Sequence, residues 1–212
     1  MKETKVISFD LDGTLTNSSF AESVWLEEIP KAYAIKNKIS LEKAKKYVFT
    51  NYNEIGNEKL EWYNILYWLN RFKLKIPPQK LLDSCKHKIK LFDDVKITLN
   101  KLSKSKKKLI IISNARREFV DLEITQTGIT KFFDRIFSAT SDFNLIKNSS
   151  EIYLKICQIC KINPPEMFHI GDQYKFDFQI PSQIGIKTIF LDRKGTPKRK
   201  KTIQSLIDLD IK

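Results

Sequence analysis

The chain has 212 residues and carries 38 basic against 25 acidic side chains, a formal net charge of +13. Its hydrophobic content of 42% can fill a core, which excludes bulk disorder, and at about 150 residues per domain the length suits one domain or one domain with an insertion. No stretch has the roughly 18 apolar residues that a membrane span needs, and the N-terminus has no signal-peptide core. The three cysteines agree with a reducing compartment. We therefore expect a soluble, cytoplasmic protein.

The predicted elements alternate between strands and helices except in one inserted stretch. Residues 5–9 (KVISF) form a short apolar run that predicts a buried strand ending on acidic residues. Between Phe20 and Phe92, apolar residues recur at helical spacing, which predicts several helices and no strand. Further strands are then predicted over 109–113, 135–138, 167–170 and 188–191, and helices over 95–102, 116–127, 150–160, 176–184 and 203–209.

This alternation predicts an α/β fold, because strands that alternate with helices form parallel units with right-handed crossovers. We expect a three-layer, Rossmann-like core with a parallel sheet, built from residues 1–16 and 92–212, and an inserted all-helical cap over 17–91. Parallel sheets keep their functional sites at the carboxyl ends of the strands. The polar residues that follow the predicted strands should therefore meet at one rim.

Acidic and polar residues do follow the predicted strands. Asp10 and Asp12 follow the first strand, and Asp172 follows the strand over 167–170. Three carboxylates at one rim would repel one another unless a cation lay among them, and carboxylate oxygens are ligands that suit Mg²⁺. We therefore predict a Mg²⁺ site whose ligands are Asp10, Asp12 and Asp172.

These residues also suit phosphoryl transfer, which needs a nucleophile, neutralisation of the phosphate charge and a proton for the leaving group. Asp10 is the predicted nucleophile, which would form an aspartyl-phosphate, and Asp12 is the predicted general acid and base. We expect Asp177 to support the site from behind the ligands. The residues predicted to bind the substrate phosphate are Ser113 and Asn114, where a helix begins, and Lys147.

The motifs resemble those of the haloacid dehalogenase superfamily, in the branch with a helical cap between the first and second motifs. FDLDGTL at 9–15 is similar to the first motif, ISNA at 112–115 to the second and GDQYKFD at 171–177 to the fourth. Two places depart from the pattern: Lys147 precedes Asn-Ser-Ser where relatives carry Pro-Asp-Pro, and Asp93-Asp94 stands where relatives often have Pro-Gly. Phosphatases of the superfamily keep an Asp two positions after the nucleophile and dehalogenases lack it. The resemblance therefore implies, through Asp12, phosphoester hydrolysis.

Together these features predict a Mg²⁺-dependent phosphatase that hydrolyses a small phosphorylated metabolite through an aspartyl-phosphate. A phosphoglucomutase-like phosphoryl transferase needs the same acids and stays open. The charge of +13 also leaves open a non-catalytic basic binding protein on the same fold, although scattered lysines are typical of a solvated surface. As a partner we expect the metabolite, not a membrane or a nucleic acid, and the chain is expected to be a monomer or a homodimer.

Several other residues favour packing over chemistry. An Asp-Gly pair after a strand is common in turns, and Ser113 could cap a helix. His169 lies inside a predicted strand and is expected to pack in the core. Cys157 and Cys160 lie on a predicted helix with no second cysteine pair, so packing is predicted for them too. The tryptophans of the inserted stretch are expected to pack a helical bundle, with the alternative that one or two line a substrate face: Trp25, Trp62 and Trp68.

Overall fold

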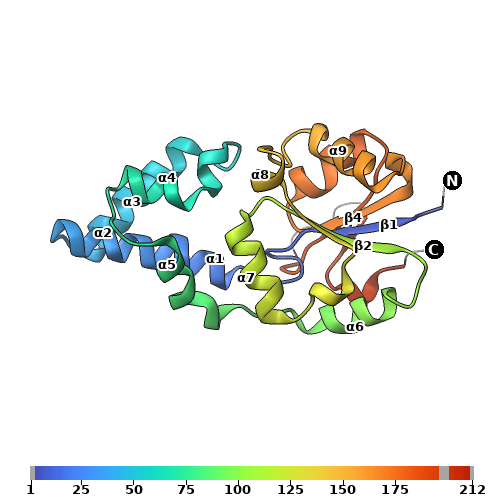
Figure 1. Ribbon diagram of the computed structural model, residues 1–212, viewed down its shortest axis with the longest axis horizontal. Coiled ribbons are helices and arrows are strands. Elements are labelled where there is room, and N and C mark those ends of the chain that lie inside the picture. The colour runs from blue at the N-terminus through green and yellow to red at the C-terminus, as the bar shows by residue number, and fades with distance from the viewer. Residues whose placement is uncertain (1–2, 196–200, 211–212) are drawn as a thin grey trace. The chain divides into compact units, whose positions relative to one another are not determined.

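The computed structural model describes residues 3–195 and 201–210. The chain divides into two compact units (Figure 1). The first, here called the core unit, is Met1–Asn17 together with Lys90–Lys212, and the second, here called the helical unit, is Ser18–Ile89. None of the helices in the described part of the chain combines the length and the apolar character that a membrane crossing requires.

The core unit is built on a parallel sheet. Among the described residues six strands pair in the order β3-β2-β1-β4-β5-β6. Phe9 of the central strand β1 lies opposite Ile111 of β2 and Ile170 of β4, so the carboxyl ends of these three strands lie side by side. The strands are β1 (Val6–Phe9), β2 (Lys108–Ser113), β3 (Arg135–Ser138), β4 (Met167–Gly171), β5 (Lys187–Leu191) and β6 (Thr202–Ile203).

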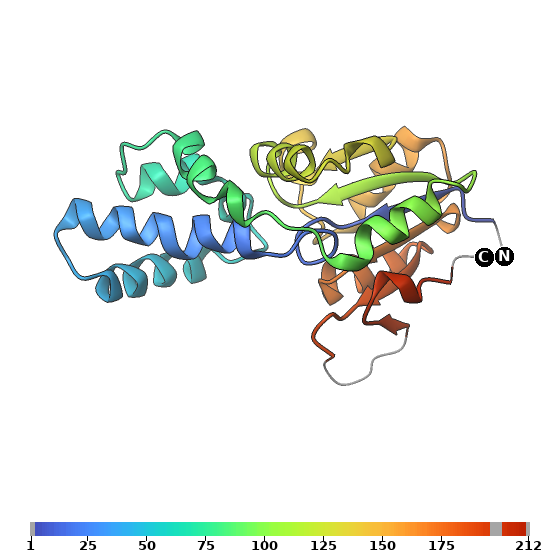
Figure 2. The ribbon, with the colours of Figure 1, turned by 90° about the horizontal axis from the view of Figure 1, so that it is seen from below.

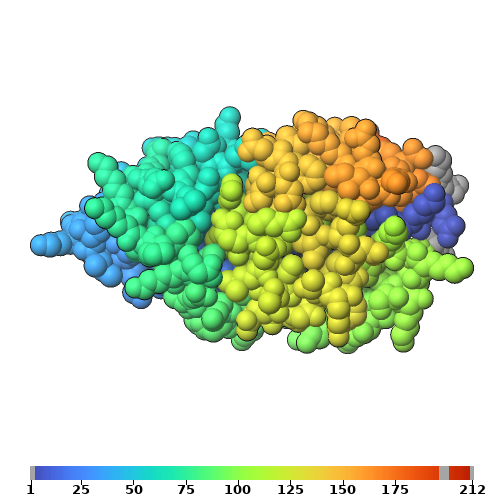
Figure 3. Space-filling model, in the orientation of Figure 1, coloured from blue at the N-terminus to red at the C-terminus, as the bar shows by residue number. Residues whose placement is uncertain are grey.

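Helices cover both faces of this sheet, which gives three layers. One face buries apolar side chains of α6 (Asp93–Leu102) and α7 (Arg117–Thr127). The other face buries those of α9 (Ser150–Cys160), the π-helical turn η6 (Tyr174–Gln179) and α10 (Ile180–Gln183). Figure 2 shows α6 lying across the strands, and in the space-filling view the segments around α7 and α9 cover most of the core-unit side turned to the viewer (Figure 3). Shorter helices are η4 (Thr130–Phe132), α8 (Ala139–Asp142) and η5 (Pro164–Glu166).

The predicted α/β architecture is confirmed, and the five predicted strands match β1 to β5 to within one residue at each end. The predicted helix over 203–209 is wrong. β6 and the 3₁₀ turn η7 (Leu206–Asp208) stand there instead. The reason is a buried carboxylate from α6, since the Ser205 hydroxyl and the Leu206 N–H both donate to Asp94 Oδ2 at 2.7 Å. These bonds hold the chain extended at Ser205, where a helix would need the same N–H for itself.

The helical unit contains no strand among its described residues, as predicted. Ser40 caps α3 by accepting the Lys43 N–H at 3.3 Å, and the helix ends at Gly56. The rings of Tyr52 and Trp68 pack edge to face at 4.6 Å inside the unit. Its helices are α1 (Ser19–Glu22), η1 (Ser23–Glu28), α2 (Ile29–Asn37), α3 (Leu41–Ile55), η2 (Leu60–Tyr63), α4 (Ile65–Arg71), α5 (Pro78–Cys85) and η3 (Lys86–Lys88).

Candidate active site

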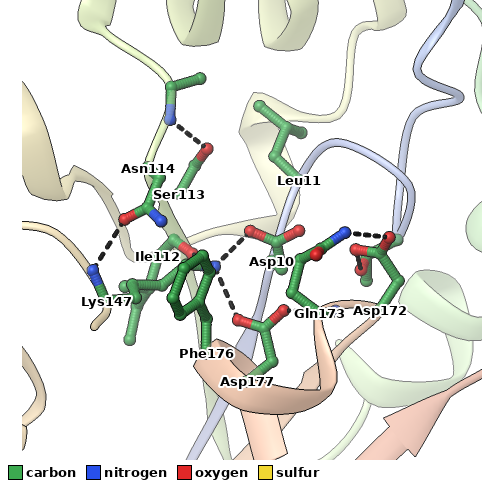
Figure 4. Close-up of polar contacts among 12 residues, drawn as sticks. Asp10, Leu11, Ile112, Ser113, Asn114, Lys147, Asp172, Gln173, Phe176 and Asp177 are labelled. Carbon is green, nitrogen blue, oxygen red and sulfur yellow. Dashed lines mark hydrogen bonds and ion pairs between the residues drawn. The ribbon is translucent and has the colours of Figure 1, made fainter. Parts of the chain in front are cut away.

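A buried lysine joins two aspartates at the carboxyl end of the sheet (Figure 4). Asp10 directly follows β1, and its N–H donates to the Ile170 carbonyl at 2.9 Å, which continues the pairing with β4. Lys147 Nζ lies 2.5 Å from Asp10 Oδ1 and 2.7 Å from Asp177 Oδ1, and it donates to the Ile112 carbonyl at 3.1 Å. Lys147 is 1% exposed and Asp10 is 5% exposed. Three oxygens therefore hold this ammonium group in one place, out of contact with water.

The charges around this lysine do not balance, because three carboxyl groups surround one ammonium. Burial opposes the charged form of Lys147, but attraction to Asp10 and Asp177 raises the pKa of the lysine well above its usual value. Burial, with repulsion from Asp177 and Asp172, raises the pKa of Asp10 well above its usual value despite the pull of Lys147. The lysine therefore stays charged, and a bound cation would favour the ionised form of Asp10, which burial and the other two carboxylates oppose.

Asp177 lies in the first turn of η6 and is fully buried. Although burial raises the pKa of Asp177, Lys147 and His169 lower it to about 2. Its Oδ2 accepts the Gln173 N–H at 3.0 Å. A Cβ on Gly171 would lie 2.3 Å from Asp177 Cγ, so only glycine leaves room for this carboxylate. Asp177 is therefore ionised at neutral pH and, together with Asp10, holds Lys147.

Asp172 follows β4 and is half-buried. Thr14 Oγ1 donates to its Oδ1 at 3.3 Å, and Gln173 Nε2 donates to its Oδ2 at 3.1 Å. Burial and repulsion from Asp177 raise the pKa of Asp172 to about 6. Gly13, with φ at +82°, brings the first motif against this side chain, since a Cβ there would lie 2.4 Å from Asp172 Oδ2. The two glycine-containing turns thus pack the acidic side chains together.

A metal ion fits this group of acids. Carboxylate oxygens of Asp10, Asp172 and Asp177 all lie within 4.8 Å of one another. All are hard oxygen donors of the kind that Mg²⁺ takes, and the pKa values of Asp10 and Asp172 are raised first by burial and then by repulsion from Asp177, which a cation would offset. The grouping differs from the predicted ligand set in one member: Asp177, expected behind the ligands, belongs to the group, and Asp12 does not.

The Asp12 carboxyl instead contacts Glu123 of α7. Burial raises the pKa of Asp12, and the hydrogen bond from Glu123 opposes that rise. Burial and the charge of Asp12 raise the pKa of Glu123 well above its usual value, so Glu123 holds its proton more tightly than Asp12 does. Thr16 Oγ1 donates to Glu123 Oε2 at 2.5 Å, and Glu123 is fully buried.

Glu123 is a site residue that the sequence analysis missed. The helical spacing of the sequence indicates that Glu123 is buried, because Glu123 lies on the same face of α7 as Phe119, Val120 and Ile124. An acidic residue at a core position of an amphipathic helix is rarely buried without a polar partner. What the pattern alone lacks is the identity of that partner.

Ser113 and Asn114 end β2 beside Lys147, as Figure 4 shows. Ser113 Oγ accepts the Ala115 N–H at 3.0 Å, and Asn114 Oδ1 accepts the Lys147 N–H at 2.9 Å. The second bond ties the loop that carries Lys147 to the end of β2. The structure therefore brings Ser113, Asn114 and Lys147 together, while α7 begins only at Arg117.

His169 is fully buried in β4, as predicted, but it also belongs to the polar network beneath the site. Its Nδ1 pairs with Ser8 Oγ at 2.8 Å, and its Nε2 lies 3.1 Å from Asp177 Oδ1 and 3.3 Å from the Tyr153 hydroxyl. Burial lowers the pKa of His169. Through Asp177, this imidazole helps to hold Lys147. Cys157 packs in the core, as predicted, with Cys160 partly buried against it.

Comparison with known proteins identifies a family model and solved structures that this chain resembles. A family model described as haloacid dehalogenase-like hydrolase matches residues 7–191. The structure is similar to that of a HAD phosphatase from Thermococcus onnurineus, with a TM-score of 0.86 and 22% identity over 97% of this chain and 95% of the other. It is also similar to a predicted phosphoglycolate phosphatase from Haemophilus somnus (TM-score 0.68, 20% identity, 98% and 97% covered). An L-2-haloacid dehalogenase from Xanthobacter autotrophicus gives a TM-score of 0.65 at 15% identity, with 97% and 96% covered. No curated protein matches the chain.

Proposed function

The chain belongs to the haloacid dehalogenase-like hydrolases, and from that premise we propose that it is a Mg²⁺-dependent phosphatase that hydrolyses the phosphate monoester of a small metabolite. The observation that carries the proposal is the group of Asp10, Asp172 and Asp177 around Lys147, in which negative charge exceeds positive charge. A divalent cation and a phosphate ester together complete such a site.

The second acid of the first motif favours a phosphate ester over an organohalide. A halide leaves without a proton, whereas the alkoxide of a phosphate ester needs one. Burial raises the pKa of Asp12, which favours the protonated form that a general acid needs. Solved structures of both phosphatases and dehalogenases share this fold, so the fold alone does not separate the two reactions.

In the proposed reaction, one oxygen of the Asp10 carboxylate attacks phosphorus while the other is held by Lys147. The bond between phosphorus and the ester oxygen breaks, and Asp12 donates its proton to that oxygen. Asp12, now ionised, then takes a proton from water, which attacks phosphorus and releases Asp10 and inorganic phosphate.

The remaining residues of the site would bind the phosphate or the metal ion. Lys147 and the groups at the end of β2, Ser113 and Asn114, would contact the oxygens of the phosphate. The residues that would hold Mg²⁺ are Asp10 and Asp172, with Asp177 beside them. When bound, the ion neutralises charge on the oxygens of the transferred phosphoryl group.

The test is phosphate release from a panel of phosphorylated metabolites, measured with Mg²⁺ and with EDTA. We expect release in Mg²⁺ only, and a loss of about a thousandfold or more in Asp10→Asn, because the amide cannot act as the nucleophile. Asp93→Asn is the matched control, since it removes an exposed carboxylate of the same unit outside the site. Equal rates in Asp10→Asn and the parent protein would refute the mechanism, and no release from any ester would refute the activity.

A further inference from the structure

A small pocket of about 230 Å³ lies wholly within the helical unit. Its lining is unusual for a protein with 38 basic residues, because no lysine or arginine is among the lining residues and the single charged one is Glu22. Three of its six residues are aromatic. The lining residues are Ala21, Glu22, Trp25, Leu26, Tyr52 and Trp62.

The rings that line the pocket lie at steep angles to one another. The ring centres of Trp25 and Tyr52 are 6.3 Å apart and the ring planes are nearly perpendicular, at 86°. Those of Tyr52 and Trp62 are 6.1 Å apart at 62°. Rings set at such angles around one pocket form an incomplete cage, in which a guest meets more than one aromatic face.

Hydrogen bonds hold the Tyr52 ring and the backbone of the two tryptophans in place before any guest arrives. The Tyr52 hydroxyl donates to the Trp25 carbonyl at 3.1 Å, and burial raises the pKa of this hydroxyl, so that it stays neutral. Trp68 Nε1 donates to the Trp62 carbonyl at 3.2 Å, and the Trp68 ring packs against Tyr52. A cage whose walls are already ordered loses little conformational freedom on binding.

Aromatic faces attract cations because the face of the ring is negative. The carboxylate of Glu22 is also negative and adds to this attraction. Methylated ammonium groups suit such a pocket better than primary ammonium groups, because they are weakly hydrated and need no hydrogen-bond acceptor. We propose that this pocket binds a small organic cation of the trimethylammonium class. The inference goes beyond the proposed function, because the lining of this pocket belongs to the helical unit alone.

The binding test uses choline and its uncharged isostere 3,3-dimethylbutan-1-ol with the whole chain, followed by tryptophan fluorescence and calorimetry. Two of the three tryptophans line the pocket and Trp68 is fully buried, so a bound cation changes the signal of the first two. We expect choline to bind about tenfold or more tightly than the isostere. Equal binding of both compounds, or binding of neither, would overturn the inference.

Variants locate the site. Trp62→Leu should weaken choline binding about tenfold, and Glu22→Gln about threefold. Glu22 is exposed and its Oε1 accepts the Ser18 hydroxyl at 2.6 Å, a bond that glutamine keeps, so this variant tests the charge without endangering the fold. The matched controls are Tyr47→Leu, which removes a ring that is 49% exposed outside the pocket, and Glu42→Gln. Unchanged binding in both pocket variants would place choline elsewhere and overturn the inference.

Discussion

Lys147 Nζ and Asp10 Oδ1 lie 2.5 Å apart although 137 residues separate them in the chain. The contact arises because the Lys147 N–H donates to Asn114, which follows β2, and β2 pairs with β1, which Asp10 follows. Lys147 also pairs with Asp177, so a single ammonium group holds two buried carboxylates.

Replacing this lysine should destabilise the protein. Lys147→Met removes the positive charge that pairs with two buried carboxylates, and we expect the free energy of unfolding to fall by about 3 kcal/mol or more. Urea unfolding at pH 7 measures it. The control is Lys155→Met, which breaks a pair with Glu151 whose side chains are 45% and 56% exposed, and which should change the value by about 0.5 kcal/mol or less. Similar losses in the two variants would show that the buried pair is worth no more than a surface pair.

Asp177 should make stability depend on acid pH. Its pKa of about 2 lies below the value of 3.8 for an unperturbed Asp, so it stabilises the fold above about pH 4 and this contribution is lost as the pH falls from there towards 2. We expect Asp177→Asn to lower the free energy of unfolding at pH 6 by on the order of 2 kcal/mol, with a smaller difference near pH 2.5. Denaturant titrations across this range measure the difference. A gap that stays constant down to pH 2.5 would argue against the lowered pKa.

Asp172 should make the protein less stable as the pH rises, which is the reverse of the effect of Asp177. Because its pKa of about 6 exceeds 3.8, the folded state holds this proton more tightly, and the stability that this group contributes is lost as the pH rises from about 4 through 6. In EDTA at pH 7.5 we expect Asp172→Asn to be more stable than the parent, by on the order of 2 kcal/mol. Mg²⁺ should then stabilise the parent more than the variant, since it offsets the same repulsion. Thermal unfolding with and without Mg²⁺ tests this, with Asp93→Asn as the control that should follow the parent.

Replacing Glu123 by glutamine should preserve the pH–rate profile of the enzyme, whereas replacing it by alanine should shift that profile. Since the raised pKa of Glu123 favours its protonated form, glutamine can donate to Asp12 and accept from Thr16 in the same way. We expect Glu123→Gln to keep the parent's pH–rate profile and its rate to within about twofold. Glu123→Ala removes the donor to Asp12, which raises the pKa of Asp12 and moves the basic limb of the profile to higher pH.

The same substitutions at Glu118, on the same helix and one-third exposed, serve as controls. They should leave the profile unchanged. A shifted profile in Glu123→Gln would mean that Glu123 is ionised beside Asp12, contrary to the assigned proton.

Local pattern was enough to predict most of the core unit and several residues of its site. Apolar runs such as 109–113 are short and end on polar residues, and this is typical of buried parallel strands whatever surrounds them. Once the strands were placed, parallel pairing alone implied that Asp10, Ser113 and Asp172 would meet at one rim. The predicted helix over 203–209 failed because apolar spacing alone does not reveal that Asp94 takes the N–H of Leu206.

Tertiary structure decided which buried polar side chains pair with one another. Thr16 and Glu123 are 107 residues apart in the chain, and Asp177 reaches Lys147 across 30 residues, so no window of local sequence contains either pair. A buried carboxyl takes its charge from whichever partner the packing places beside it, and for that reason Asp177 is ionised while Glu123 keeps its proton. The sequence by itself determined which residue types reach the rim of the sheet. Packing of distant segments determined which of them carry charge, because burial penalises a charge until a specific neighbour compensates it.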